Sequence, residues 1–302
     1  MSCNSRAVST ILSSLIGLSI LFAAAVFFFK WGWKKFIPVT VVAVAGLIGA
    51  AMRDAAFLSD YLTVVVSPMI VGGVWGYTFS RGKSLYFFVL VTSLSLSFMF
   101  TADYYFLKLY KNYDLVKESR ARVADIVRSS EMPEKDKTEF LSRLDASMDT
   151  VKDVVPFTYF LNSVLGALLC FYIMKAFFSR YLGGSAAAVR GLEFFKLNDY
   201  FIYALIAGWL SVLLVERSSY YAVYVFGLNL ALSFSVLYLI QSFGIIKYLL
   251  MKKNIPVLVL PAGLLVIALL GIEALLFVGI ILLSVGALDF WADFRKLETR
   301  SK

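Results

Sequence analysis

The stretch "IPVLVLPAGLLVIALLGIEALLFVGIILLSVGAL", residues 255–288, decides the fold because a single carboxylate, Glu273, interrupts an otherwise apolar run. As one helix, the run would be roughly 51 Å long at about 1.5 Å per residue, well beyond a hydrocarbon layer of about 30 Å. Divided at Gly271, it gives two shorter spans, and Glu273 lies in a turn where water can solvate its charge. The sequence therefore predicts a turn near Gly271 and no charge at mid-membrane.

The composition of the chain is that of an integral membrane protein. Of its 302 residues, 60% are apolar and 16% are charged, with a mean hydropathy of +0.81. No soluble domain of this length presents such a surface to water, and the apolar stretches recur at lengths that cross a bilayer as helices. We therefore expect an all-α, polytopic membrane protein with about nine transmembrane helices, or eight as the alternative, and an extramembrane helical hairpin.

The expected spans divide the chain into four parts. Helices one to four occupy residues 1–107, a charged hairpin residues 108–153, helices five to nine residues 154–290, and a tail residues 291–302. The first seven spans are placed at 8–29, 36–52, 57–79, 84–107, 155–178, 200–215 and 220–243. Residues 186–199 carry Val189, Leu192 and Phe195 at helical spacing, which predicts an interfacial helix on the lipid headgroups.

Basic side chains in short loops predict the orientation, because Lys and Arg collect on the cytoplasmic side. The cluster at 247–253 and the tail at 295–302 are both basic, so an even number of crossings must separate them, in agreement with a turn near Gly271. We expect a multi-pass protein of the bacterial cytoplasmic (inner) membrane, with the N-terminus outside and the C-terminus in the cytoplasm. Residues 108–153, placed outside, go against the rule because they hold ten Lys and Arg.

The residue types that many enzymes and metal sites use are scarce. The chain has no histidine, and its two cysteines, Cys3 and Cys170, are far apart in sequence. We find no G-x-S-x-G motif and no paired nucleophile and base, so we expect no enzyme, no metal and no cofactor. The net charge of +9 is explained by Lys and Arg placed beside the apolar spans, where they set the orientation in the membrane. We therefore expect no nucleic-acid partner.

Polar side chains inside the expected spans are the candidates for a ligand site. In the third span Asp60, Thr63 and Ser67 share one helix face. Pro68 follows and cannot donate to the carbonyl of Val64, which predicts a kink. Interrupted helices beside polar side chains build solute sites in many transporters. The same features also occur as plain packing kinks, and the glycines that follow also serve close helix contacts, so both interpretations stay open.

Four more candidates lie in other spans. Ser97 and Thr101 fall within one arc of the fourth span, and Asn162 and Asn229 are amides in the fifth and the seventh. Acidic residues, Asp103 among them, fall toward the outer surface in the orientation above. An outward-opening cleft with an acidic rim, lined by hydroxyls and amides, would bind a polar or cationic small solute. Alternatively, the polar groups pair between helices and the carboxylates meet water at the interface.

Residues 108–153 have the pattern of two helices. Leu141, Leu144, Met148, Val151 and Val155 repeat at spacing three and four. A weaker seam precedes them and consists of Val116, Val123, Ile126 and Val127. Between the seams, "SSEMPEKDK" has the proline and the acidic side chains that begin a helix. The sequence predicts an antiparallel hairpin that continues spans four and five into water. It is either a spacer that packs on itself or an arm that docks a protein partner.

Three later stretches resemble the YybS-like bacterial membrane proteins, a family of unknown molecular function. They are "FFKLNDYFIYAL" (194–205), "QSFGIIKYLL" (241–250) and "GALDFWADFRKL" (286–297). The residues that carry the resemblance are Gln241, Gly244, Tyr248, Gly286, Asp289, Trp291, Asp293, Phe294 and Arg295. The family is distantly similar to the substrate-binding membrane subunits of energy-coupling-factor transporters. This resemblance implies a solute-binding role and carries no active site over to this chain.

Two hypotheses for the function follow. The first is a bacterial inner-membrane protein that binds or transports a small polar solute through an outward-facing cleft formed by spans three, four, five and seven. The alternative is a non-catalytic membrane scaffold or assembly protein whose hairpin docks an extracytoplasmic partner. The lipid bilayer is a partner in both. The sequence has no P-loop, so active uptake would require a separate ATPase or an ion gradient.

Overall fold

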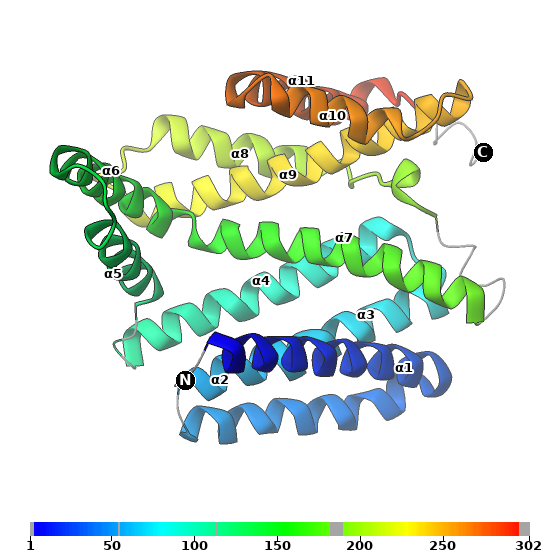
Figure 1. Ribbon diagram of the computed structural model, residues 1–302. Helices are drawn as coiled ribbons and strands as arrows, with labels where there is room; N and C mark the ends of the chain where they lie inside the picture. The colour runs from blue at the N-terminus through cyan, green and yellow to red at the C-terminus, as the bar shows by residue number, and fades with distance from the viewer. Residues whose placement is uncertain (1–2, 54, 111, 113, 182–189, 296–302) are drawn as a thin grey trace. The chain divides into compact units, whose positions relative to one another are not determined.

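The computed structural model describes residues 3–53, 55–110, 112, 114–181 and 190–295, which form two compact units (Figure 1). The first unit holds residues 1–81 and 90–169, and the second holds residues 82–89 and 170–302. Over the described ranges, every regular element is a helix and none is a strand. The expected all-helical class is confirmed.

Six helices in the described part of the chain are long and apolar enough to cross a bilayer. They occupy Leu15–Ala50, Phe57–Ser80, Leu85–Leu109, Val155–Ala176, Tyr221–Lys252 and Ile272–Ala292. Two further apolar helices, α8 (Phe201–Leu214) and α10 (Val259–Leu269), are shorter. A membrane protein with several apolar helices is thus confirmed, whereas the count of nine crossings stays a prediction.

The first helix, α1 (Cys3–Arg53), contains a reversal of the chain. Gly32 has a φ of 69° and a ψ of −172°, a conformation that glycine adopts without the clash of a Cβ atom. Figure 1 shows the chain folding back at this point. The two arms of α1 correspond to the first two expected spans, residues 8–29 and 36–52.

Helix α3 (Ser67–Ser80) packs on α1 at backbone contact. An ideal Cβ atom at Gly72 would lie 2.5 Å from the carbonyl oxygen of Leu21, and one at Gly76 would lie 2.9 Å from that of Ala25. Small residues at spacing four let membrane helices approach closely. The glycines of the third span therefore serve helix packing, one of the two interpretations that the sequence leaves open.

The third span is interrupted, as predicted, by a segment of π-helix, which has more residues per turn than an α-helix. Helix α2 (Ala55–Tyr61) continues into α3 through a π-helical segment, Leu62–Val66. Pro68 follows this segment, and its missing N–H removes the donor that the carbonyl of Val64 would have in an α-helix. Ser67 Oγ donates to the carbonyl oxygen of Leu62 at 2.8 Å, which anchors the hydroxyl inside its own helix.

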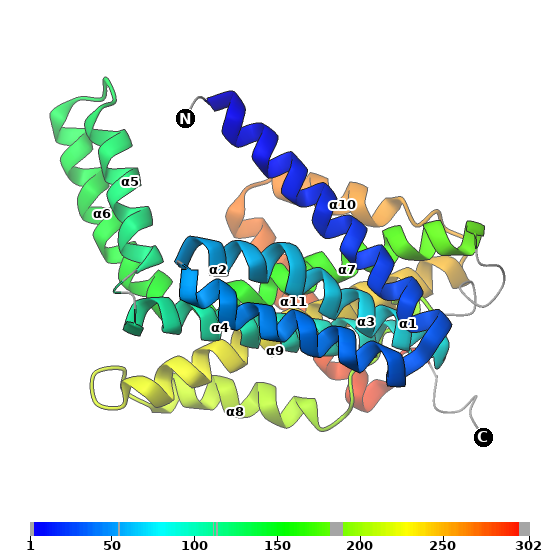
Figure 2. The same cartoon turned by 90° about the horizontal axis from the view of Figure 1, so that it is seen from below.

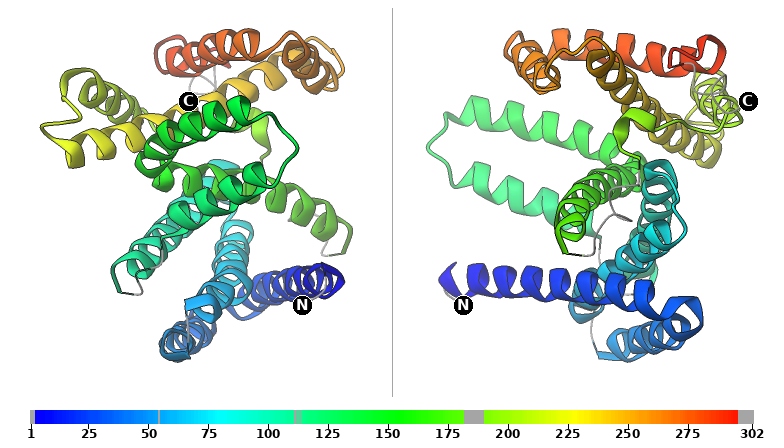
Figure 3. Two further views of the ribbon diagram at one scale, coloured as in Figure 1. Left: turned by 60° about the vertical axis from the view of Figure 1, so that its left-hand side comes forward. Right: turned by 90° about the vertical axis from the view of Figure 1, so that its right-hand side faces the viewer.

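Helices α4 and α7 are joined by an antiparallel pair, α5 and α6, which we call the hairpin (Figures 2 and 3). Asp114 caps α5 by accepting from the backbone N–H of Val116 at 3.0 Å. Helix α6 begins directly after Pro133, as the sequence predicts. The bounds are Leu85–Tyr110 for α4, Leu115–Arg128 for α5, Glu134–Asp153 for α6 and Val155–Tyr181 for α7.

The packing inside the hairpin follows only part of the expected seams. Val116 is buried, whereas Ile126 is 68% exposed and Val151 is 40% exposed. At the base of the hairpin, Val116 packs with Tyr104 of α4 and Val155 of α7. The hairpin thus packs on α4 and α7 at its base, and some side chains of its expected seams are exposed.

In the second unit, α8 and α9 (Tyr221–Lys252) form an antiparallel pair with touching backbones. An ideal Cβ atom at Gly208 would lie 2.6 Å from the backbone nitrogen of Ala231. Helix α11 (Ile272–Ala292) also packs on α9, where Gly286 lies against the carbonyl oxygen of Tyr238. Glycines thus place both neighbours of α9 close to its backbone.

The predicted turn near Gly271 is confirmed. Helix α10 ends at Leu269 and α11 begins at Ile272, and Gly271 between them has a φ of 107°, which favours glycine. Glu273 lies in the first turn of α11 with an exposed side chain. At a helix N-terminus its carboxylate also has a favourable interaction with the helix dipole.

The segment that leads into α8 corrects one expectation. Residues 186–189 lie outside the described residues, and residues 190–199 contain only a 3-10 turn, Leu192–Phe194. The predicted interfacial helix is therefore wrong for residues 190–199. Phe195 is 0% exposed and Leu197 is 4% exposed, so these side chains pack inside the protein and not on lipid headgroups.

Candidate functional site

The predicted ligands of the third span do not form a cluster. Asp60 in α2 and Thr63 in the π-helical segment are both exposed. Ser67 is buried, but its hydroxyl is bound to the carbonyl of Leu62. Asp60 and Thr63 are thus exposed whereas Ser67 is buried, and the π-helical segment Leu62–Val66 lies between Asp60 and Ser67.

The remaining predicted ligands lie in three helices. Ser97 of α4 donates to the carbonyl oxygen of Pro156, in the first turn of α7, at 3.3 Å. Thr101 of α4 has a buried Oγ1 atom without a hydrogen-bond partner. Asn162 of α7 is exposed. Asn229 belongs to the second unit, where its amide donates to the carbonyl oxygen of Val225 at 2.7 Å within α9.

A half-buried carboxylate outside the predicted set lies on α4, close to α7. Asp103 lies inside the apolar span Leu85–Leu109, and its Oδ1 atom is buried without a hydrogen-bond partner. Tyr159 of α7 lies within electrostatic range of this carboxylate. The ring of Tyr159 also packs on Phe100, with 5.8 Å between the ring centroids. We call Ser97, Phe100, Asp103 and Tyr159 the α4–α7 face.

The geometry of α4 separates Asp103 from the predicted Thr101. The two residues are two positions apart, which puts them about 200° apart around a helix, so they cannot both contact one small ligand. The nearest cation in sequence, Lys108, lies 3.8 Å from the carboxylate of Asp114 and 5.7 Å from the ring centroid of Tyr104. Lys108 is therefore already engaged by Asp114 and Tyr104.

The second unit contains a buried ion pair. Arg295 Nη2 donates to Asp289 Oδ2 at 2.7 Å, and both side chains are 0% exposed. Arg295 Nη1 donates to the carbonyl oxygen of Phe195 at 2.8 Å, and the N–H of Phe294 donates to Asp289 Oδ1 at 3.0 Å. A buried charge pair is tolerated only with such additional hydrogen bonds.

Gln241 of α9 connects this pair to the segment before α8. Its Oε1 accepts from the N–H of Leu197 at 2.8 Å, and its Nε2 donates to Asp289 Oδ2 at 3.1 Å and to the carbonyl oxygen of Gly286 at 3.2 Å. The three stretches on which the family resemblance rests therefore meet in one network. We call Gln241, Asp289 and Arg295 the buried network.

Beside the buried network lies a second ion pair. Lys247 Nζ donates to Glu193 Oε2 at 2.6 Å. Burial alone raises the pKa of Glu193, but the hydrogen bond from Lys247 and nearby lysine charges outweigh it and hold the pKa below its ordinary value. Arg295 Nη1 also donates to the carbonyl oxygen of Glu193 at 3.3 Å. Lys247 and Arg295, from the two basic clusters expected in the cytoplasm, thus contact the same residue.

The sequence contained partial signals for these groups. Gln241 is an amide in an apolar span, a signal equal to that of Asn229, and Asp289 and Arg295 flank the end of α11. The sequence also shows that Asp103 is a carboxylate close to the end of an apolar span. Pairing Gln241 with Asp289 across 48 positions, or Arg295 with the carbonyl of Phe195 across 100 positions, requires the fold.

A metal site is not formed by the described residues, where no three His, Cys, Asp or Glu side chains are grouped to hold an ion. The chemical options are thus the carboxylate of the α4–α7 face, the buried network and the charged surface of the hairpin. The buried network satisfies most of its own donors and acceptors, which is the behaviour of a structural element. The α4–α7 face does not.

Comparison with known proteins places the chain in a family. The sequence profile described as "Predicted membrane protein (DUF2232)" matches residues 7–285, which includes α4, the hairpin and α7 and ends before Asp289 and Arg295. Neither the comparison with curated proteins nor that with solved structures gives a match. The chain therefore belongs to the DUF2232 family of predicted membrane proteins.

Proposed function

We propose that this protein binds or transports a small polar solute at the α4–α7 face, through a cleft that opens to the outside of a bacterial inner membrane. The observation that carries the proposal is the buried, unpartnered Oδ1 of Asp103 inside an apolar span. A buried charge is costly unless a partner compensates it, and ionisable groups within membrane-spanning helices commonly mark solute paths. A solute with a cationic, hydrogen-bond-donating group would supply this partner.

The chemistry of the α4–α7 face favours an amine or another organic cation. Asp103 provides a carboxylate, and Tyr159 provides a phenol within electrostatic range. The rings of Phe100 and Tyr159 pack together beside it, and aromatic faces attract cations. Ser97 would contribute its hydroxyl only by releasing the carbonyl of Pro156.

The other predicted ligands have weaker support as direct contacts. Asp60, Thr63 and Asn162 are exposed, and Ser67 and Asn229 donate within their own helices. In this proposal the exposed ones belong to the path of the solute, and Asp103 binds it. The resemblance to substrate-binding subunits of energy-coupling-factor transporters agrees with such a role and leaves the energy source to a separate ATPase or an ion gradient.

The proposal includes the predicted orientation. The N-terminus lies outside, the C-terminus lies in the cytoplasm, and the hairpin is extracytoplasmic. The common contact of Lys247 and Arg295 with Glu193 supports this arrangement, because it puts two basic clusters at the same end of the second unit. The protein is proposed not to be an enzyme.

A ligand screen tests the solute proposal. The full chain in nanodiscs is screened for thermal shifts with metabolites that carry amines, and hits are followed by uptake in cells. A solute at 100 times its Kd adds about 2.7 kcal/mol of stability, which such a screen detects. Asp103→Asn, which keeps the size and removes the charge, is expected to lower affinity at least tenfold.

The matched control is Glu216→Gln, which removes an exposed carboxylate in the second unit. It is expected to leave the affinity unchanged. Equal affinity in wild type and Asp103→Asn, or a complete absence of cationic ligands, would contradict the proposal.

A second candidate function is a membrane scaffold whose hairpin docks another protein. It is favoured by the charged groove along the hairpin, between α5 and α6. Deletion of residues 112–150 distinguishes the two functions. If Asp103→Asn leaves growth and solute uptake unchanged while the deletion abolishes function, the scaffold is the better account.

A further inference from the structure

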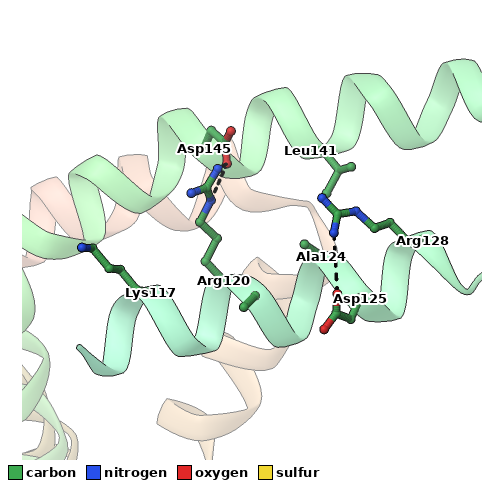
Figure 4. A pocket seen from close by; sticks show the side chains of 8 residues that line it. Lys117, Arg120, Ala124, Asp125, Arg128, Leu141 and Asp145 are labelled. Carbon is green, nitrogen blue, oxygen red and sulfur yellow. Dashed lines mark hydrogen bonds and ion pairs between the residues drawn. The ribbon is translucent and has the colours of Figure 1, made fainter. Parts of the chain in front are cut away.

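The hairpin has a long groove on its surface. Two adjoining hollows, of about 290 Å³ and about 350 Å³, share Lys117, Arg120 and Asp145. Figure 4 shows the first of them. Together they reach from Val116 near the base to Arg128 near the tip of α5. These two residues are twelve positions apart, or about 18 Å along a helix. The length suits an extended occupant better than a compact solute.

The floor of the groove is apolar and partly built from small side chains. Ala121 and Ala124 of α5 and Leu141 of α6 line one hollow, and Val116 and Met148 line the other. Two alanines three positions apart let another helix approach closely, because helix packing depends on grooves between side chains. A pair of helices with an apolar surface left between them can accept a third helix.

The rim of the groove carries an excess of positive charge. Among the described residues that line the hollows, four are basic and two are acidic: Lys117, Arg120, Arg128 and Lys152, with Asp125 and Asp145. Residues 108–153 as a whole contain ten basic and ten acidic side chains. The hairpin is thus neutral overall, whereas the described lining of this groove carries more basic than acidic residues.

Ion pairs fix part of this rim. Arg120 lies 2.6 Å from Asp145 across the groove, and Arg128 lies 3.7 Å from Asp125 on α5 (Figure 4). The two acidic residues are therefore already engaged by two of the arginines. An incoming partner meets the net positive charge of the described rim, to which Lys117 contributes at the base.

We propose that the hairpin groove binds an acidic amphipathic helix of a partner protein. The inference rests on the second candidate function, docking through the hairpin, and names its site and its partner chemistry. The helix presents apolar side chains at positions i, i+3 or i+4, and i+7 to the alanine and leucine floor. Its flanking Glu and Asp side chains face the basic rim, with Lys117 at the base, and the three helices form a small bundle.

Selection from a peptide library tests this inference on the full chain in nanodiscs of neutral lipid. A display library of helical peptides of about 14 residues, random in charge, is selected for binding. The enriched peptides are expected to be acidic and to have a single apolar stripe. Their affinity is expected to fall at least tenfold for the double variant Lys117→Glu and Lys152→Glu, and to weaken as salt is raised.

Two further variants separate the groove from the general charge of the hairpin. Arg143→Glu reverses an exposed charge outside the groove, paired with Glu139, and is expected to leave the affinity unchanged. Ala124→Gln fills the floor without changing charge and is expected to weaken binding, with circular dichroism and thermal unfolding confirming that the variant folds.

Several results would overturn the inference. These are no enrichment, enrichment without acidic bias, or equal binding to wild type and the Lys117→Glu, Lys152→Glu variant. A photocrosslinker at position 124 that joins two copies of this chain in cells would also overturn it, because the groove would then be a self-association site. If these results appear while deletion of residues 112–150 still abolishes function, the inference fails and the docking function stands.

Discussion

The buried network makes a quantitative prediction about stability. Replacing Asp289 with Ala removes the acceptor for Arg295 Nη2, for Gln241 Nε2 and for the N–H of Phe294. The guanidinium of Arg295, which is 1% exposed as a residue, would then be buried without a counter-charge. Breaking a buried ion pair from one side costs about 3–5 kcal/mol. We expect Asp289→Ala to lower the free energy of unfolding by that amount.

An exposed ion pair serves as the matched control. Arg143 and Glu139 are four residues apart on α6 and lie 2.5 Å apart, with side chains 77% and 54% exposed. Pairs of this kind contribute about 0.3–0.5 kcal/mol, so Glu139→Ala should have a small effect. The two variants remove the same type of interaction and differ in its burial.

The double variant Asp289→Leu and Arg295→Met separates the ion pair from the packing. Removing both charges leaves no uncompensated ion, and replacing a buried ion pair by apolar residues is often neutral or stabilising. Gln241 Nε2, the N–H of Phe294 and the carbonyl oxygen of Phe195 each still lose a hydrogen-bond partner. The double variant should therefore be no less stable than Asp289→Ala. Denaturant unfolding of the purified protein in detergent micelles, followed by tryptophan fluorescence, measures all of these. A loss for Asp289→Ala as small as that for Glu139→Ala would refute the reasoning.

Two other predictions concern packing and pH. Gly76→Leu should destabilise the protein by at least about 2 kcal/mol in the same assay, because a Cβ atom there meets the backbone of α1, whereas Gly49→Leu, which has open space, should be nearly neutral. Equal effects of the two substitutions would contradict the close contact of α1 and α3. The pKa of Glu193 is lowered in the folded protein, so its ionised carboxylate stabilises the fold at pH values above the ordinary carboxyl pKa. This stabilisation is lost as the pH falls through the lowered pKa. On acidification below about pH 4.5, the melting temperature of Glu193→Gln should thus fall less than that of wild type. If the melting temperatures of the two proteins fall in parallel with pH, the ion pair of Glu193 with Lys247 does not stabilise the fold.

Much of the helical plan could be predicted from the sequence, because helix length and turn residues are local signals. A helix through residues 255–288 would be too long for a bilayer, and Gly271 provides the conformation that the turn needs. Pro133 marks the start of α6 for a similar reason. These predictions depend on residues within one or two helical turns of each other, so they can be made from the sequence without knowing the fold.

The segment 190–199 shows where this reasoning fails. Apolar residues at spacing three predict a helix, but Phe195 and Leu197 are buried between other helices, and the backbone instead supplies donors and acceptors to Gln241 and Arg295. These tertiary hydrogen bonds compensate for the helical ones that are absent. A periodic pattern does not reveal such a competing partner, which lies 44 positions away in the case of Gln241.

The candidate site was predicted only in part. The spacing of hydroxyl and amide side chains in membrane helices does not show which of them are available to a ligand. Ser67 and Asn229, for example, donate to carbonyls of their own chain segments. Asp103 differs from them because a buried carboxylate oxygen has no such local donor. Whether a polar side chain is satisfied depends on its rotamer and neighbours, which spacing does not determine.

The central claim is that the hairpin and the turn at Gly271 lie on the outside of the membrane, opposite the end of α9. Single cysteines are introduced as Arg143→Cys, Glu273→Cys and Lys252→Cys after Cys3 and Cys170 have been replaced by serine. An impermeant maleimide applied to intact cells should label positions 143 and 273, and position 252 only after permeabilisation. Labelling of 252 in intact cells, or protection of either 143 or 273, would contradict the outward-facing site and the orientation on which it depends.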